Sequence, residues 1–167
     1  MRNLMISILM ILMLFYNWGC NPSDRDNAKN LALIEKYIQA VESLDYETMA
    51  ECLDDAYLGV GPSYQDSTAK QDALINWKYN VENLYESIKY LKSSNIVATT
   101  TTGDNPGNWV SNWAELQIKY KDGENVIVLV NSIYLIENDK IVKSFTFYNE
   151  ADVLEQLGYV FINLGKS

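Results

Sequence analysis

Residues 109–149 read WVSNWAELQIKYKDGENVIVLVNSIYLIENDKIVKSFTFYN, and this stretch decides the fold. The dipeptides Asp122-Gly123 and Asn138-Asp139 are of the turn type and separate runs rich in Val, Ile, Tyr and Phe. This arrangement predicts a meander of three strands joined by two tight turns. A meander of this length must bury one face, and the amphipathic helices able to cover it all precede it in the chain.

Apolar residues recur at spacings of three and four in two segments before the meander, which predicts helices over about 28–44 and 70–88. The apolar stripe of the second segment consists of Leu74, Trp77, Val81, Leu84, Tyr85 and Ile88. Asp45 is placed to cap a short helix over 46–53. Strands are expected at 56–60 and 90–102, with a loop between 61 and 68, and a last short helix at about 150–158 would end at Gly158.

Composition limits the possible functions. The 167 residues fit one domain plus a targeting segment, and the net charge is −9, with 13 Lys and Arg against 22 Asp and Glu. No basic stripe is present, so we do not expect nucleic acid as a partner. The absence of histidine excludes Ser-His-Asp and Cys-His catalysis and His-ligated zinc or iron sites. The sequence contains no metal-ligand constellation and no phosphate-binding glycine loop, so no cofactor is expected.

The N-terminus has the pattern of an export signal. Arg2 precedes an apolar run from Leu4 to Tyr16 that is too short to span a membrane. Gly19-Cys20 resembles the lipobox of bacterial lipoproteins, although Asn17 and Trp18 depart from its usual aliphatic and small residues. The resemblance implies a signal peptide at 1–19 and a lipidated tether at 20–27. The protein would then be exported to the cell envelope and attached to the membrane only through its N-terminal lipid, with an ordinary secreted protein or an uncleaved anchor as alternatives.

The order of the predicted elements resembles the nuclear transport factor 2-like (NTF2-like) superfamily, in particular its SnoaL-like branch. Three segments carry the resemblance: residues 44–49, residues 61–74, and residues 140–158 with their closing Leu154-Glu-Gln-Leu-Gly158. The resemblance covers residues 28–160 and leaves 161–167 as a tail. It implies an α+β, cystatin-like cone in which a strongly bent antiparallel sheet packs against three N-terminal helices around a cavity. Members include isomerases, polyketide cyclases, epoxide hydrolases and dehydratases, and others only bind ligands or partners, so the fold does not select a function.

Enzymes of this superfamily use a buried acid, whose pKa rises in apolar surroundings so that it moves protons near neutral pH. Asn149 stands where many relatives carry an Asp, and an amide cannot act as a general base. Two candidate catalytic carboxylates remain. Glu115 shares a strand face with two tryptophans, and it is either a base in the cavity or an outward-facing group paired with Lys119 or a partner. Asp66 precedes the long helix as a candidate base or as a turn or cap residue.

The same cone can hold a small, mostly apolar molecule against aromatic walls, or it can present its sheet to a partner. Asn131 interrupts an apolar strand, so its amide either faces a pocket or braces a loop. A dimer formed through the sheet, with the cavity filled by side chains, is a third hypothesis. The candidate ligand-binding residues are Tyr64, Trp77, Tyr85, Trp109, Trp113, Asn131, Tyr134, Tyr148 and Asn149.

Overall fold

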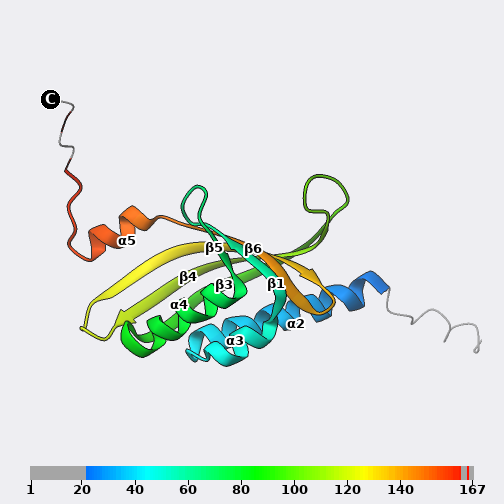
Figure 1. Ribbon diagram of the computed structural model, residues 1–167, viewed down its shortest axis with the longest axis horizontal. Helices are drawn as coiled ribbons and strands as arrows, with labels where there is room; N and C mark the ends of the chain where they lie inside the picture. The colour runs from blue at the N-terminus through cyan, green and yellow to red at the C-terminus, as the bar shows by residue number, and fades with distance from the viewer. Residues whose placement is uncertain (1–21, 163–164, 166–167) are drawn as a thin grey trace, which may run out of the picture.

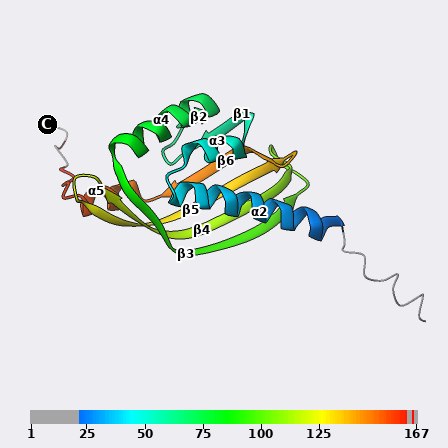
Figure 2. The same cartoon turned by 90° about the horizontal axis from the view of Figure 1, so that it is seen from below.

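Three helices cover one face of a curved six-stranded sheet in the computed structural model, which describes residues 22–162 and residue 165 (Figures 1 and 2). The covering helices are α2 (Pro22–Glu42), α3 (Tyr46–Cys52) and α4 (Lys70–Asn83), and the short α5 (Glu150–Gln156) follows the last strand. The strands are β1 (Leu53–Val60), β2 (Ser67–Ala69), β3 (Tyr85–Thr100), β4 (Gly107–Tyr120), β5 (Asn125–Glu137) and β6 (Lys140–Tyr148). We call the face toward α2–α4 the inner face and the opposite one the outer face.

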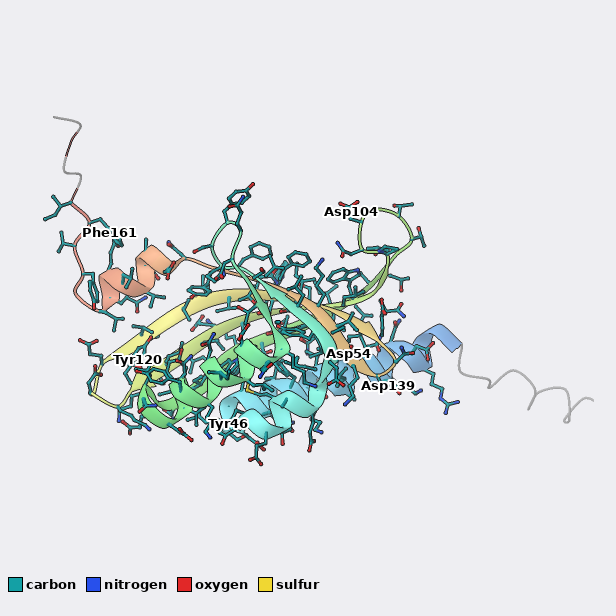
Figure 3. The ribbon with its side chains drawn as sticks, viewed as in Figure 1. Tyr46, Asp54, Asp104, Tyr120, Asp139 and Phe161 are labelled. Carbon is teal, nitrogen blue, oxygen red and sulfur yellow. The ribbon has the colours of Figure 1, made fainter. Side chains whose placement is uncertain are left out.

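The meander predicted for residues 109–149 is confirmed. Strand β5 pairs antiparallel with both β4 and β6 at the centre of the order β2-β1-β6-β5-β4-β3. Between β5 and β6, Asn138 and Asp139 form a two-residue turn with φ values of 51° and 59°, as a type I′ hairpin requires. In Figure 3, Tyr120 lies at one end of the long strands and Asp139 at the other.

One strand pair differs from the expected antiparallel sheet. Strand β1 begins at Leu53, earlier than predicted, and pairs in parallel with β6, so the sheet is mixed. A parallel pair needs a crossover connection. Here the chain between β1 and β6 passes through α4 and the three strands β3–β5. Hydrophobic patterns within each strand carry no information about this pairing, because β1 and β6 lie far apart in the sequence.

Helix α2 supplies much of the core that joins the helices to the sheet. Its predicted apolar stripe is confirmed, with Ile34, Ile38 and Val41 buried in one cluster with Val110 and Ile141 of the sheet. Burying such side chains stabilises the fold by roughly 1.5–3 kcal/mol each. Cys52 is free and buried in the same cluster, as expected for a small hydrophobic residue.

The prediction that α4 extends to Ile88 is wrong, because the helix ends at Asn83 and β3 starts at Tyr85. An irregularity in the pairing between Tyr85 and Ser87 shifts the register of β3. The extra residue places Tyr85 and Ile88 on the same inner face, so the strand imitates the i, i+3 spacing of a helix. The Lys121 ammonium donates to the carbonyl oxygens of Val81 and Glu82 at 3.0 and 2.6 Å, which satisfies the last turn of α4.

Local signals at the other helix ends act as predicted. The Asp45 carboxylate accepts from the Thr48 amide at 3.0 Å and caps α3. Gly158, at φ 82°, follows the end of α5. Helix α2 begins at Pro22, within the segment predicted as a tether, and the predicted signal peptide and Cys20 lie outside the described residues. None of the described helices is both long and apolar enough to cross a membrane.

Candidate functional site

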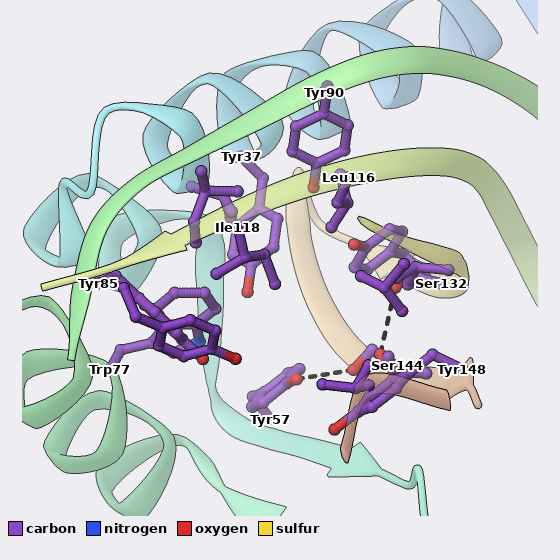
Figure 4. Close-up of a pocket in the computed structure, with 18 residues that line it drawn as sticks. Tyr37, Tyr57, Trp77, Tyr85, Tyr90, Leu116, Ile118, Ser132, Ser144 and Tyr148 are labelled. Carbon is purple, nitrogen blue, oxygen red and sulfur yellow. Dashed lines mark hydrogen bonds between the residues drawn. The ribbon is translucent and has the colours of Figure 1, made fainter. Parts of the chain in front are cut away.

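A cavity of about 290 Å³ lies between the inner face of the sheet and helices α2 and α4. It extends toward the end of the sheet at Tyr120. Seven of the chain's 12 tyrosines line it, together with one tryptophan. Figure 4 shows Tyr37, Tyr57, Tyr85 and Tyr90 reaching the cavity from a helix and two strands. The lining consists of Tyr37, Val41, Tyr57, Trp77, Tyr85, Ile88, Tyr90, Leu116, Ile118, Tyr120, Val128, Val130, Ser132, Tyr134, Ser144, Thr146, Tyr148 and Val153.

The phenols of this cavity hold their protons. Burial raises the pKa of Tyr134 and of Tyr85 to about 12, and it raises the pKa of Tyr37 well above its usual value. Burial is also the main cause of the raised pKa values of Tyr57, Tyr90, Tyr120 and Tyr148. At neutral pH the cavity therefore offers uncharged hydroxyls that can donate and accept hydrogen bonds.

Specific contacts order these side chains. The hydroxyls of Tyr57 and Ser144 are 2.7 Å apart, and those of Ser132 and Thr146 are 3.2 Å apart; both bonds are drawn in Figure 4. The rings of Tyr37 and Tyr134 meet edge to face, with centroids 5.7 Å apart. A row of tilted rings runs through Trp77, Tyr85 and Tyr120, with successive centroid distances of 6.3 and 5.6 Å. These contacts hold the walls apart as a preformed apolar space with hydroxyl groups in it.

Helix α5 borders the end of the cavity near Tyr120. Its Val153 is part of the lining. The Gln156 amide bonds both backbone groups of Ile127, accepting from the N–H at 2.9 Å and donating to the C=O at 2.8 Å. This stretch of β5 lies beyond the last residue that pairs with β6, so the side chain takes the place of a neighbouring strand. Asn149, one of the predicted ligand-binding residues, instead caps α5 by accepting from the Asp152 amide at 3.3 Å.

Within the described residues, no Asp, Glu, Lys or Arg lines the cavity. The candidate base Glu115 lies on the outer face, where its carboxylate pairs with Lys92 at 2.8 Å rather than with Lys119. Asp66 is exposed in the loop before β2, outside the lining, although its charge contributes to the raised pKa of Tyr148. The structure therefore brings neither predicted carboxylate to the cavity wall. No group of three potential metal ligands occurs in the described part of the chain.

Of the predicted ligand-binding residues, Trp77, Tyr85, Tyr134 and Tyr148 line the cavity. The odd-numbered positions of β4 and β5 face outward, which places Trp109, Trp113 and Asn131 on the outer face. Trp109 stacks on Phe145 there, and the Asn131 amide donates to Ser111 at 2.9 Å, so it braces the neighbouring strand. Tyr64 is 93% exposed at the tip of its loop.

Four tyrosines that line the cavity were not predicted from the sequence: Tyr37, Tyr57, Tyr90 and Tyr120. Tyr37 lies beside the apolar stripe of α2, and this position in the sequence predicts that its side chain is buried. Tyr120 shares the even parity of Leu116 and Ile118, which marks it as an inner-face residue. Tyr57 and Tyr90 could be assigned to the cavity only once the pairing of β1 and the irregularities of β3 were known.

No protein-family model and no curated protein matches this sequence. Solved structures with the same fold include a SnoaL-like candidate polyketide cyclase from Shewanella denitrificans OS-217 (TM-score 0.60, 11% identity, 77% of this chain and 96% of that one). An LEH-like epoxide hydrolase from M. tuberculosis is similar over 78% of this chain and 90% of its own, with a TM-score of 0.57 and 9% identity. An NTF2-like protein from Anabaena variabilis ATCC 29413 is similar over 81% and 98%, with a TM-score of 0.60 and 13% identity.

These likenesses show an α+β, NTF2-like fold, as the sequence predicted. Identities this low carry no activity from those proteins to this one. The side chains of this chain's own cavity are therefore what bears on its function.

The buried phenols make stability depend on alkaline pH. The unfolded chain releases tyrosine protons near pH 10, whereas Tyr85 and Tyr134 keep theirs in the folded protein up to about pH 12. Unfolding then releases protons, so the free energy of unfolding falls as pH rises between these values. The free energy of unfolding is measured with urea at several pH values between 10 and 12 for wild type and Tyr134→Phe. It should fall less steeply with pH in the variant, because one titrating phenol has been removed. Equal slopes in the two proteins would contradict the predicted role of Tyr134.

Proposed function

We propose that this domain binds a small, uncharged, mostly apolar molecule in its cone cavity and does not transform it. The observation that carries the proposal is the composition of the wall: seven neutral phenols, one indole, aliphatic side chains and three small hydroxyl residues, with no charged group among the described residues. Such a surface favours apolar rings and offers a few polar groups for orientation. A charged ligand would lose its hydration in this cavity without gaining an opposite charge.

The alternative of an acid–base enzyme lacks a base at the site. General base catalysis works best when the pKa of the base lies near the operating pH. The cavity phenols have raised pKa values, about 12 for Tyr85 and Tyr134, so they stay protonated near neutral pH. They can donate a hydrogen bond to a carbonyl oxygen but cannot readily take a proton from a substrate. Glu115 and Asp66 lie outside the cavity wall and so do not supply the missing base. Binding is therefore the better-supported function.

The size of the space limits the ligand. Pockets for drug-sized molecules hold roughly 300–1,000 Å³, and this cavity, at about 290 Å³, lies just below that range. Two or three fused or linked rings suit it better than a large sterol or a lipid with long chains.

A cavity-filling substitution tests the proposal. Val130 lines the cavity from β5, and its neighbour Leu129 points to the outer face with 71% of its surface exposed. The uncharged fluorophore N-phenyl-1-naphthylamine brightens in apolar surroundings and should bind wild type saturably. Val130→Phe should weaken this binding by about tenfold or more because the added ring occupies the site, whereas Leu129→Phe should bind as wild type does. No saturable binding to wild type, or an equal effect of the two variants, would overturn the proposal.

We also propose that the domain is held at a membrane by a lipid on Cys20. The support is the apolar run that precedes Gly19-Cys20 and the high proportion of acidic residues, which gives the protein itself little attraction to anionic lipid surfaces. A single acyl chain anchors weakly, so a stable attachment needs more than one chain on the modified cysteine.

Cys20→Ala should move the protein from the membrane fraction of the expressing cells to the soluble fraction. It should also abolish incorporation of a labelled fatty acid. The variant Cys52→Ala is the matched control, because Cys52 is buried in the core and offers no accessible thiol. Membrane retention of Cys20→Ala at the wild-type level would contradict lipidation as the anchor.

We further propose that the outer face binds a second copy of the domain. Trp113, Leu129 and Phe147 line one shallow groove there and are 57%, 71% and 52% exposed. Exposed apolar side chains gathered in one place mark a candidate contact surface. A two-fold contact would bury the same patch on both copies.

Leu129→Glu should therefore shift the sedimentation of the protein toward the monomer, because it places two carboxylates in the contact. Ile75→Glu is the matched control, since Ile75 is 59% exposed on α4, away from the sheet. A wild-type protein that sediments as a monomer at high concentration, or an equal effect of both substitutions, would contradict the proposed dimer.

A further inference from the structure

A second recess of about 190 Å³ adjoins the cone cavity on the side of α4, and we call it the polar annex. The two spaces share Tyr57, Trp77, Ser144 and Thr146. The annex is otherwise lined by backbone and small side chains of β1 and β2 and by one face of α4. Its lining is Tyr57, Gly59, Val60, Gly61, Thr68, Ala73, Asn76, Trp77, Asn80, Ser144 and Thr146.

Two carboxamides are the distinctive feature of the annex. Asn76 and Asn80 are four residues apart on α4, so they lie on one face of the helix. Neither side chain has a hydrogen-bond partner within the described residues, and the same holds for the Thr68 hydroxyl and the Trp77 indole N–H. The annex thus presents two side-chain amides, a hydroxyl and an indole N–H that make no hydrogen bond within the described residues.

Another asparagine of α4 behaves differently. The Asn83 amide donates to the Tyr79 carbonyl of its own helix at 2.9 Å, so it is partly satisfied without a ligand. Asn80 is half-buried and Asn76 is exposed, and no buried polar side-chain atom of the described residues lacks a partner, so solvent reaches both amides. Both amides line the annex, where a ligand entering from the cone cavity would displace that solvent and meet them.

The glycine of β1, Gly59, helps to keep this space open. A Cβ atom at Gly59 would lie 2.7 Å from the Tyr57 hydroxyl, too close for an ordinary contact. A side chain there would push the phenol that borders both spaces away from its bond with Ser144. Gly59 thus allows Tyr57 to stand between the apolar cavity and the annex.

We infer that the annex takes the hydroxyl-bearing end of an uncharged ligand whose apolar ring body lies in the cone cavity. An amide both donates and accepts, as a hydroxyl does, so Asn76 and Asn80 match that group in both senses. No charged side chain lines the annex within the described residues, which gives no advantage to an ion. This inference rests on the proposed binding function and adds the polar chemistry of the ligand to it.

A matched pair of probes tests the inference. 2-(2-Naphthyl)ethanol and 2-propylnaphthalene have the same ring and nearly the same shape, and they differ by a terminal hydroxyl or methyl group. Their affinities are measured from naphthalene fluorescence with wild type, the double variant Asn76→Leu/Asn80→Leu, and Gln71→Leu. Gln71 is an exposed residue of the same helix that lines neither space, so it controls for the exchange of a polar for an apolar residue on α4.

The double variant should bind the alcohol about tenfold more weakly, as expected for the loss of one or two hydrogen bonds. It should bind 2-propylnaphthalene as tightly as wild type or more tightly, and Gln71→Leu should change neither affinity. Leucine is a better helix former than asparagine, so α4 is retained, and Thr68→Val gives a second, milder change in the same recess. If the double variant binds both probes more weakly by the same factor, or binds the alcohol as tightly as wild type does, the annex does not bind the hydroxyl group and the inference is wrong. If wild type binds neither probe, the proposed binding function itself has failed.

Discussion

The two-residue alternation of β4 and β5 is the constraint on which the site depends. Successive side chains of a strand point to opposite faces, so one choice of register divides every residue of the meander between two surfaces. Even positions, among them Leu116, Val128 and Tyr134, face the helices. Odd positions, among them Trp113, Glu115 and Leu129, face outward. This division gives the inner face its neutral phenols. It gives the outer face an apolar patch that is bordered by the ion pair of Lys92 and Glu115. A shift by one residue would place a carboxylate and two indoles in the cone instead.

The division also determines which side chains the cavity of this fold presents. The cone shape follows from a bent sheet and its covering helices, and these depend on apolar patterning that many sequences satisfy. Proton transfer depends on a single side chain in the wall. The side chain of Asn149, which the resemblance in sequence places at the position of an acid, caps α5 here. The tyrosines that line the space are uncharged at neutral pH, as ordinary tyrosines are, and burial raises their pKa values further. The described wall thus presents uncharged hydroxyl, aromatic and aliphatic groups, on which the proposed binding function rests.

Much of the fold could be predicted because its signals are local. The turns at Asp122-Gly123 and Asn138-Asp139, the cap at Asp45 and the stripe of α2 depend on residues a few positions apart. The site was predicted less well because it depends on long-range register. The irregularity between Tyr85 and Ser87 gives a strand the spacing of a helix, so β3 was mistaken for the end of α4. The parallel pairing of β1 with β6 brings Tyr57 to Ser144, a contact between residues far apart in the chain. The alternation of side chains along β4 puts Glu115 on one of the two sheet faces. The alternation alone does not show which of these faces the helices cover, so it could not show whether Glu115 faces the cone.

The two proposed interactions use opposite faces of the same strands, and this determines how they affect each other. A ligand in the cone would contact mainly even positions of β4 and β5, whereas a second copy would contact mainly odd positions, with Val130 bordering both spaces. Any influence between them would have to pass through a change in the curvature of the sheet, and such coupling would be reciprocal: a ligand that strengthened association would itself bind more tightly to the dimer. The long, continuous pairing of β4 with β5 resists such a change. The contacts of α5 through Gln156 hold the end of β5 in place as well. The structure therefore favours a domain in which the ligand site and the association surface act independently.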